Sequence, residues 1–293
     1  MKAYSFLKRH YGILIGIGFV IVWMVIFIFV SVFWTWGEIF YCAAEYQQCF
    51  CEKIDTSRMV AEPINAWSNF FYVGAGLIVL MYYDLQRNKK STRKEDYLSR
   101  KENLHYLLTY GLSVIWIGIA SFLMHATWRG DTGYLDLLSM NMYISLIFFI
   151  SLSVLFDLNP TSFYPILVGN FIFNGVLMRF LNAELIFVSW VLIAFLNEFA
   201  VGSGLYSKIF KKRARQIRRN LLVLIGAVGV FLLAYYLWHF GYRGHPLCDP
   251  YSWWQWHALW HFMTAVTTIL LVIYLKTEKT SSTREGQIEV SPP

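Results

Sequence analysis

The sequence predicts an all-α integral membrane protein with eight transmembrane helices, and three observations carry this prediction. Of the 293 residues, 57% are hydrophobic and only 15% are charged, which is typical of a polytopic membrane protein and not of a soluble domain. The apolar residues gather in eight runs, each about 17–25 residues long, which is the length that a helix needs to cross a bilayer. The basic residues lie in the segments between these runs.

The first apolar run covers residues 11–34 and follows a basic segment that contains Lys2, Lys8 and Arg9. It is too long for the apolar part of a signal peptide, and no small-residue cleavage site follows it cleanly, so we expect a retained membrane anchor. The other seven runs lie at residues 65–83, 104–127, 134–156, 161–180, 183–205, 219–240 and 255–275. The tail after Lys276 is polar, and we expect residues 277–293 to be disordered.

The basic residues predict the orientation in the membrane. Alternation of eight helices places the N-terminus, the 84–103 loop, the 206–218 loop and the tail on one side, and these segments hold most of the lysines and arginines. The positive-inside rule therefore predicts that both termini are cytoplasmic. The net charge of +7 then reflects topology, so we expect no nucleic-acid partner.

All four cysteines fall on the opposite, external side, where free thiols are exposed to oxidation. Disulfides are therefore expected, with unpaired buried thiols as the alternative. Cys248 is alone in its loop and must reach back to the segment 35–64 if it pairs. We favour the pairs Cys51–Cys248 and Cys42–Cys49.

Two histidines open the last apolar run. His257 and His261 are four residues apart, so a helix places both imidazoles on one face, where they can reach one metal ion. The alternative is an ordinary core or interfacial histidine pair. His125 lies at the external end of the 104–127 helix, at a similar depth in the membrane. Ionisable groups at membrane depth are costly and are usually functional.

Two further polar residues are expected at this level. Ser121 lies one turn before His125, and Asp136 opens the 134–156 helix. These two residues and His125 each have an ordinary alternative role: Ser121 in helix packing, Asp136 as a helix cap, and His125 in an aromatic belt. Together, three histidines, one carboxylate and one hydroxyl fit a catalytic zinc ion with an open fourth position.

These residues resemble the signature of the alkaline ceramidases, which belong to the CREST superfamily of seven-helix membrane hydrolases together with the adiponectin and progestin receptors. The resemblance is carried by Ser121-Phe-Leu-Met-His125, by Asp136 and by His257-Ala-Leu-Trp-His261. It extends to Cys51-Glu52 and to the segment 61–69, Ala-Glu-Pro-Ile-Asn-Ala-Trp-Ser-Asn. It implies a seven-helix transmembrane bundle, residues 65–276, preceded by an external segment, 35–64, and by one extra N-terminal transmembrane helix within residues 1–34.

The resemblance also implies roles for single residues. His125, His257 and His261 would be zinc ligands, Ser121 and Asp136 would be catalytic, and a Cys51–Cys248 bridge is supported. The family's ceramidases also bind calcium near the N-terminal block. Here Glu52 and Glu62 stand at matching positions and Asp55 lies nearby, but Cys49 and Ile54 replace an expected Asp and Asn. These departures weigh against a calcium ion.

The implied activity is zinc-dependent hydrolysis of ceramide, or of a related lipid amide, to a sphingoid base and a fatty acid. The expected location is a bacterial inner membrane or the ER or Golgi membrane, with the site toward the external or luminal face. One alternative is a receptor-like or lipid-binding member of the superfamily with a mainly structural zinc ion. The other is a transporter or channel, whose path could be marked by four intramembrane polar residues, Asn170, Asn174, Asn197 and Glu198.

Overall fold

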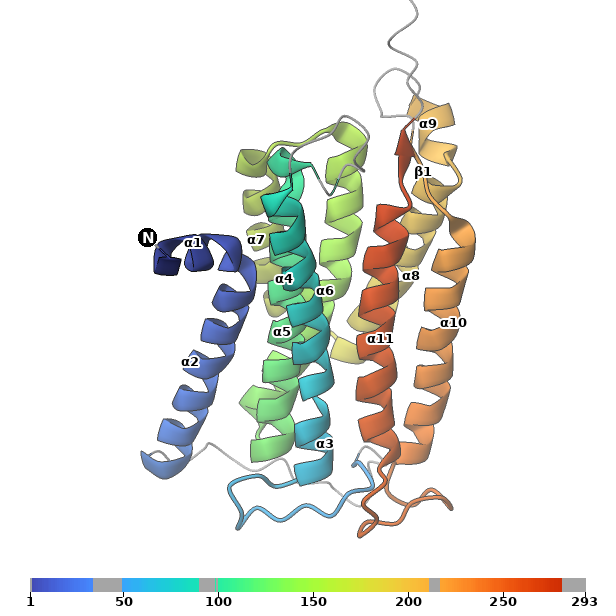
Figure 1. Cartoon of the computed structure of the whole chain (residues 1–293). Helices are drawn as coiled ribbons and strands as arrows, with labels where there is room; N and C mark the ends of the chain where they lie inside the picture. The colour runs from blue at the N-terminus through green and yellow to red at the C-terminus, as the bar shows by residue number, and fades with distance from the viewer. Residues whose placement is uncertain (1, 34–48, 90–97, 99, 211–216, 281–293) are drawn as a thin grey trace, which may run out of the picture.

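The protein is an all-α bundle of long helices that run roughly side by side (Figure 1). The computed structural model describes residues 2–33, 49–89, 98, 100–210 and 217–280. The helices are α1 Lys2–Arg9, α2 Tyr11–Phe33, α3 Pro63–Ser68, α4 Phe70–Asn88, α5 Leu104–Thr127, α6 Gly130–Phe156, α7 Pro160–Leu177, α8 Ala183–Gly202, α9 Leu205–Phe210, α10 Leu221–Trp238 and α11 Trp256–Lys276, with short 3-10 turns η2 Lys101–Asn103 and η4 His239–Gly241.

Seven of the described helical segments are long and apolar enough to cross a membrane, which agrees with the predicted membrane bundle. They correspond to α2, the continuous pair α3–α4, and α5, α6, α8, α10 and α11. The one remaining predicted span, residues 161–180, is also a helix, α7, but it does not meet the same criteria of length and hydropathy. Its two prolines, Pro160 and Pro165, and its two asparagines, Asn170 and Asn174, lower its mean hydropathy.

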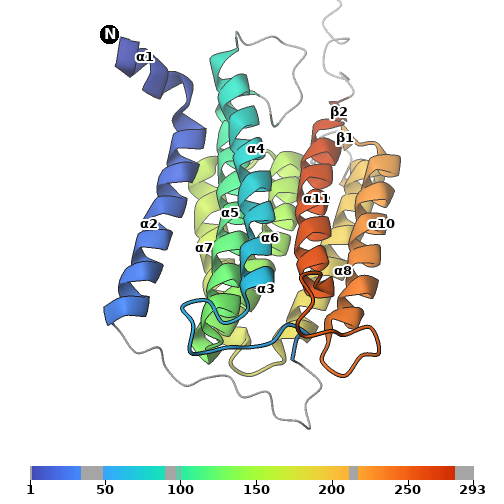
Figure 2. The same ribbon diagram turned by 60° about the horizontal axis from the view of Figure 1, so that its bottom comes forward.

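The two ends of the bundle differ in character (Figures 1 and 2). At the histidine end, which contains His125 and His257, the segment 49–62 meets the segment 241–255 below α3 and α11. The opposite, basic end contains Arg87, Lys208 and Lys276. Here β1 Ile217–Arg218 pairs antiparallel with β2 Lys279–Thr280, so the expected disorder of the tail does not extend to residues 277–280. Residues 281–293 lie outside the described part of the chain.

Close packing of α4 on α5 depends on glycines. A Cβ atom on Gly76 would lie 2.6 Å from the backbone oxygen of Gly111, and one on Gly118 would lie 2.8 Å from that of Asn69. Small residues let helix backbones approach in a membrane, where packing rather than the hydrophobic effect holds helices together. We call this contact of α4 with α5 at Gly76, Gly111 and Gly118 the glycine crossing. It brings α3 and the end of α5 together at the histidine end.

The extra helix α2 is docked onto the bundle at its edge (Figure 1). It packs against α4 and α5, and Gly12 and Gly16 allow a close approach to Tyr83 and Leu80. The carboxylate of Asp84, on α4, accepts hydrogen bonds from the backbone N–H groups of Gly12 and Ile13 at 2.8 and 3.0 Å. A carboxylate at a helix N-terminus satisfies free donors and complements the helix dipole. This anchor is therefore a packed part of the molecule.

Three of the four intramembrane polar residues that could mark a transport path, Asn170, Asn174 and Glu198, link helices to one another. Asn170 donates to Ser145 Oγ, and Trp190 donates to Asn174 Oδ1, which ties α7 to α6 and α8. At the basic end, Arg219 forms ion pairs with Glu198 at 2.7 Å and with Glu278 at 3.1 Å. Buried polar groups need partners, and these contacts supply them.

The glycine crossing yields a test. Gly76→Ala places a methyl group against the Gly111 backbone, so overpacking should lower the free energy of unfolding by about 1–3 kcal/mol. Gly74→Ala on the same helix is the matched control, because a Cβ atom there meets nothing within 4 Å. Thermal unfolding of the two variants and the wild type in detergent would measure the loss of stability. Equal stability of the two variants would contradict the account of the crossing.

Candidate metal centre and active site

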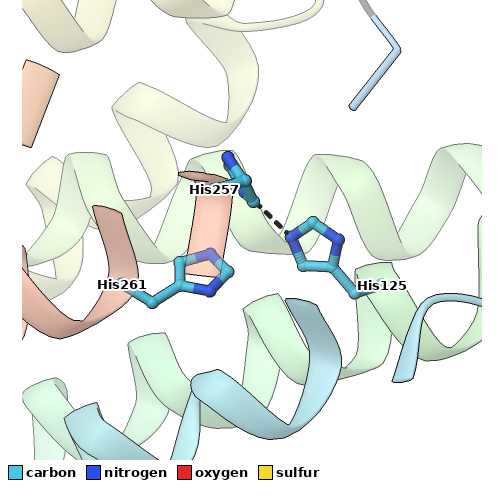
Figure 3. A group of neighbouring side chains, drawn as sticks. All are labelled: His125, His257 and His261. Carbon is cyan, nitrogen blue, oxygen red and sulfur yellow. Dashed lines mark hydrogen bonds between the residues drawn. The ribbon is translucent and has the colours of Figure 1, made fainter. Parts of the chain in front are cut away.

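Three histidines converge at the histidine end of the bundle (Figure 3). His125 comes from the last turn of α5, and His257 and His261 come from the first two turns of α11. Their relative exposures are 0%, 5% and 2%. One ring nitrogen from each lies within 4.8 Å of the others, and this is the only group of its kind among the described His, Cys, Asp and Glu residues.

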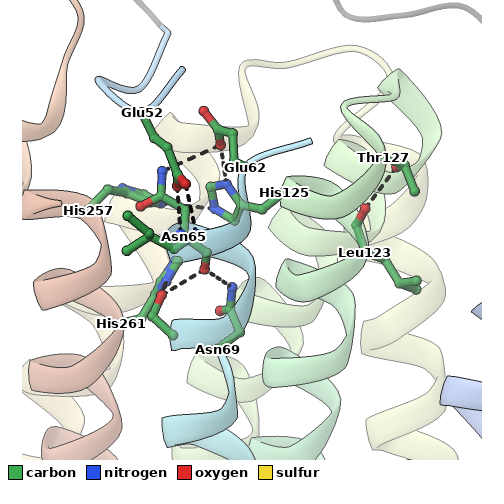
Figure 4. A network of polar contacts seen from close by, with 11 residues as sticks. Glu52, Glu62, Asn65, Asn69, Leu123, His125, Thr127, His257 and His261 are labelled. Atoms are coloured by element: carbon green, nitrogen blue, oxygen red, sulfur yellow. Dashed lines mark hydrogen bonds and ion pairs between the residues drawn. The ribbon is translucent and has the colours of Figure 1, made fainter. Parts of the chain in front are cut away.

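Two of the imidazoles are oriented by polar partners on the side away from this point (Figure 4). His125 Nδ1 lies 2.7 Å from Glu62 Oε2, and His261 Nδ1 lies 2.7 Å from Ser68 Oγ. Ser68 Oγ donates its own proton to the backbone oxygen of Asn65, so it accepts from the N–H of His261. His261 Nδ1 then carries the proton, and its Nε2 has a lone pair free for a metal ion. His125 takes the same form when Glu62 is ionised and accepts from its Nδ1. Ligating histidines usually have such second contacts.

The donor set fits a cation. His125 Nε2 lies 3.1 Å from His257 Nε2, so the nitrogens converge where a shared ion could be held. Burial raises the pKa of the Glu62 carboxyl to about 8, against the opposing hydrogen bond from Asn65. A positive charge held by His125 would favour the ionised carboxylate. Three imidazoles suit zinc among the divalent ions, because zinc binds nitrogen ligands and keeps a fourth position in catalytic sites.

A cavity of about 880 Å³ brings the two predicted catalytic residues to the histidines. Ser121, Asp136, His257 and His261 all line it. The side chain of Ser121 lies near the Asp136 carboxyl, and both residues are buried. One carboxyl oxygen, Asp136 Oδ1, is buried and has no hydrogen-bond partner in the described structure, so it is available to a water molecule or substrate.

The structure corrects the expected position of Asp136 in its helix. Helix α6 begins at Gly130 and not at residue 134, so the segment 130–133, expected to precede the helix, forms its first turn. Asp136 therefore lies in the second turn and does not cap the helix. Trp128 adopts a left-handed conformation, φ 51° and ψ 50°, at the end of α5. This lets the chain enter α6 after only two linking residues, and it holds Asp136 close to Ser121.

The three carboxylates considered for calcium are not gathered into a metal-type cluster among the described residues. Glu52 accepts hydrogen bonds from the backbone N–H groups of Ile64 and Asn65 at 2.8 and 2.7 Å, at the start of α3. Burial raises its pKa to about 7, and these two bonds oppose the shift. Asp55 is paired with Arg58 at 2.9 Å, and Glu62 supports His125. Each carboxylate thus has another structural partner.

A disulfide joins Cys51 to Cys248, with their Cα atoms 5.5 Å apart, and ties the segment before α3 to the loop before α11. Cys49 is also disulfide-bonded. Cys42, its expected partner, lies outside the described residues. Ser68 and Glu62, which orient the histidines, were not expected in these roles, because their partners are remote in sequence. For Ser68 and His261 the separation is 193 residues.

A second cavity, of about 410 Å³, continues from the first toward the basic end. Its walls come mainly from apolar side chains of α6, α8, α10 and α11. Both cavities are lined by Tyr72, Ile117, Met140, Phe187, Val188 and Trp260. The shared walls show that a long apolar space adjoins the polar site.

The fold and the site define a multi-pass all-α membrane protein with a buried three-histidine cluster that could hold a metal ion. A family model described as Ceramidase matches residues 43–290, so the chain belongs to the ceramidase family. Membership implies a hydrolase that acts on an amide bond. The match leaves α1 and α2 outside the family region. No curated protein gives a significant match to the chain.

The contact between Ser68 and His261 yields a second test. Ser68→Ala removes the acceptor that orients His261, and loss of such a contact typically weakens metal binding about 10–100-fold. Competition with a chelator on zinc-loaded protein would measure this affinity. Ser189→Ala is the control, since that exposed hydroxyl bonds only within α8, to Leu185. Unchanged affinity of Ser68→Ala would show that the contact does not support a metal site.

Proposed function

We propose that the protein is a zinc-dependent intramembrane hydrolase that cleaves ceramide, or a closely related lipid amide, to a sphingoid base and a free fatty acid. The observation that carries the proposal is the shared cavity, in which Ser121 and Asp136 face His257 and His261. Family membership supplies the reaction class. The three histidines supply the donor set for a zinc ion.

Zinc held by His125, His257 and His261 would supply Lewis acidity toward a carbonyl oxygen and would lower the pKa of water toward about 7. Glu62 and Ser68 keep the Nε2 atoms of His125 and His261 directed at the common point. All three rings are buried, and His257 and His261 border the cavity through which substrate and water would reach the site. The chain's own residues then carry the proton transfers.

Asp136 is the proposed general base and acid. Its Oδ1 atom is free to accept a proton from the attacking water, and the same carboxyl can return that proton to the leaving nitrogen. Water adds to the carbonyl carbon, and the carbon–nitrogen bond breaks. The acyl group leaves as the fatty acid, and the nitrogen leaves as the amine of the sphingoid base.

Ser121 is the proposed oxyanion donor. Its hydroxyl lies one helical turn from His125 and can turn from Asp136 toward a carbonyl oxygen that gains negative charge. A donor of this kind contributes about 3–4 kcal/mol of transition-state stabilisation in comparable sites.

The cavities suit an amphiphilic substrate. The polar groups line the larger cavity, and the adjoining apolar cavity can accept a hydrocarbon chain. The expected partners are therefore a membrane lipid and the surrounding bilayer. By the positive-inside rule, we propose that the basic end and both termini are cytoplasmic and that the histidine end faces the external or luminal side.

Replacing the proposed base tests this function. Asp136→Asn keeps the size of the side chain but removes its basicity, so turnover of ceramide should fall about 10²–10⁴-fold while zinc content stays unchanged. Asp131→Asn is the matched control, because Asp131 is exposed in the first turn of the same helix and does not line the cavity. Release of fatty acid by purified protein is the measurement.

Two outcomes would contradict the proposal in different ways. Wild-type turnover in Asp136→Asn would remove Asp136 from the mechanism. A zinc-loaded wild-type protein that binds ceramide and leaves every lipid amide intact would favour the receptor-like alternative.

A further inference from the structure

The three histidines are not supported in the same way. Glu62 holds His125 and Ser68 holds His261, each through Nδ1. His257 Nδ1 is buried and has no hydrogen-bond partner in the described structure. A ring without such a bond is free to rotate about its χ2 angle, unless packing restrains it.

Phe50 supplies that packing. Its ring stacks on the His257 ring with centroids 3.6 Å apart and an interplanar angle of 28°. It also lies nearly parallel to the ring of Tyr242, with centroids 6.2 Å apart and an interplanar angle of 10°. Phe50 also lies 5.2 Å from the ring of His125, so it borders two of the three histidines. Only 9% of Phe50 is exposed.

The backbone around Phe50 is held on both sides. Phe50 forms an antiparallel bridge with Tyr242. The N–H of Cys51 donates to Gly241 O at 2.6 Å, and the N–H of Arg243 donates to Cys49 O at 2.7 Å. Both flanking cysteines are disulfide-bonded, and Cys51 is joined to Cys248. The ring of Phe50 is therefore carried on a short, cross-linked segment.

Gly241, which pairs with Cys51 through its backbone oxygen, also contacts the backbone of His257. A Cβ atom on Gly241 would lie 3.1 Å from His257 N and 3.3 Å from its Cβ, so only glycine fits easily at this contact. Gly241 thus lets the segment 49–51 and the first turn of α11 pack together. Phe50 thus contacts the side chain of His257, and its neighbour Gly241 contacts the backbone of the same residue.

We propose that Phe50 is a positioning residue for His257, and that it supplies by ring stacking the orientation that Glu62 and Ser68 supply by hydrogen bonds. The inference rests on the proposed metal site. It assigns to the disulfide-linked segment 49–51 a direct part in building the third ligand. Loss of a contact that orients a ligand weakens metal binding about 10–100-fold, and a comparable loss is expected when the Phe50 ring is removed.

The test measures zinc affinity by chelator competition in the full chain. Phe50→Leu and Phe50→Met remove the ring but keep apolar bulk, so both should weaken zinc binding about 10–100-fold. Phe50→Trp keeps an aromatic face and should restore most of the affinity. Phe163→Leu is the matched control, because Phe163 is a fully buried phenylalanine of α7. It should leave zinc affinity unchanged.

A double-mutant cycle separates positioning from a general structural effect. In a His257→Ala background, zinc affinity is weaker and is read with a weaker chelator. In that background, Phe50→Leu should change the zinc affinity by less than about twofold, because the histidine that Phe50 positions is gone. The same loss in both backgrounds, or unchanged affinity of both Phe50→Leu and Phe50→Met, would overturn the inference. A wild-type chain that binds no zinc would instead reject the proposed metal site, and the role of Phe50 with it.

Discussion

The convergence of three buried imidazoles is the constraint on which the histidine end of the molecule depends. His261, with its proton on Nδ1, presents a lone pair toward the other two rings, as does His125 when Glu62 is ionised, and all three side chains are buried. Burying such polar atoms is costly unless they have a partner, and a cation would satisfy all three at once. The surrounding residues act on this arrangement: Glu62 and Ser68 through hydrogen bonds, and Glu52 through its contacts at the start of α3.

The helices that carry the histidines are brought together by features with little chemistry of their own. The glycine crossing between α4 and α5 places α3 beside the end of α5, and α3 also packs against α11. The Cys51–Cys248 disulfide joins the segment before α3 to the loop before α11. The short link at Trp128 sets Asp136 beside Ser121. The positions of the proposed metal ligands, base and hydroxyl thus depend on the geometry of helix ends, and the apolar cavity adjoins them because it lies between the same helices.

Much of this architecture can be predicted from the sequence, for physical reasons. A bilayer sets the length of its helices, so the apolar run 104–127 matches α5 Leu104–Thr127. Helical periodicity places His257 and His261 on one face. Helix ends are harder to predict: Gly130 and Gly133 indicate a turn, yet tertiary packing extends α6 through them. Contacts between remote residues leave no local pattern. Glu62 stands 63 residues from His125, and nothing around Phe50 indicates the ring on which it stacks.

The central claim is that His125, His257 and His261 together hold one zinc ion, and zinc K-edge X-ray absorption of the purified protein tests it most directly. The account predicts stoichiometric zinc with nitrogen and oxygen neighbours near 2.0–2.1 Å, and with the scattering pattern of about three imidazole rings. Zinc with sulfur neighbours near 2.3 Å, or purified active protein without bound metal, would contradict it.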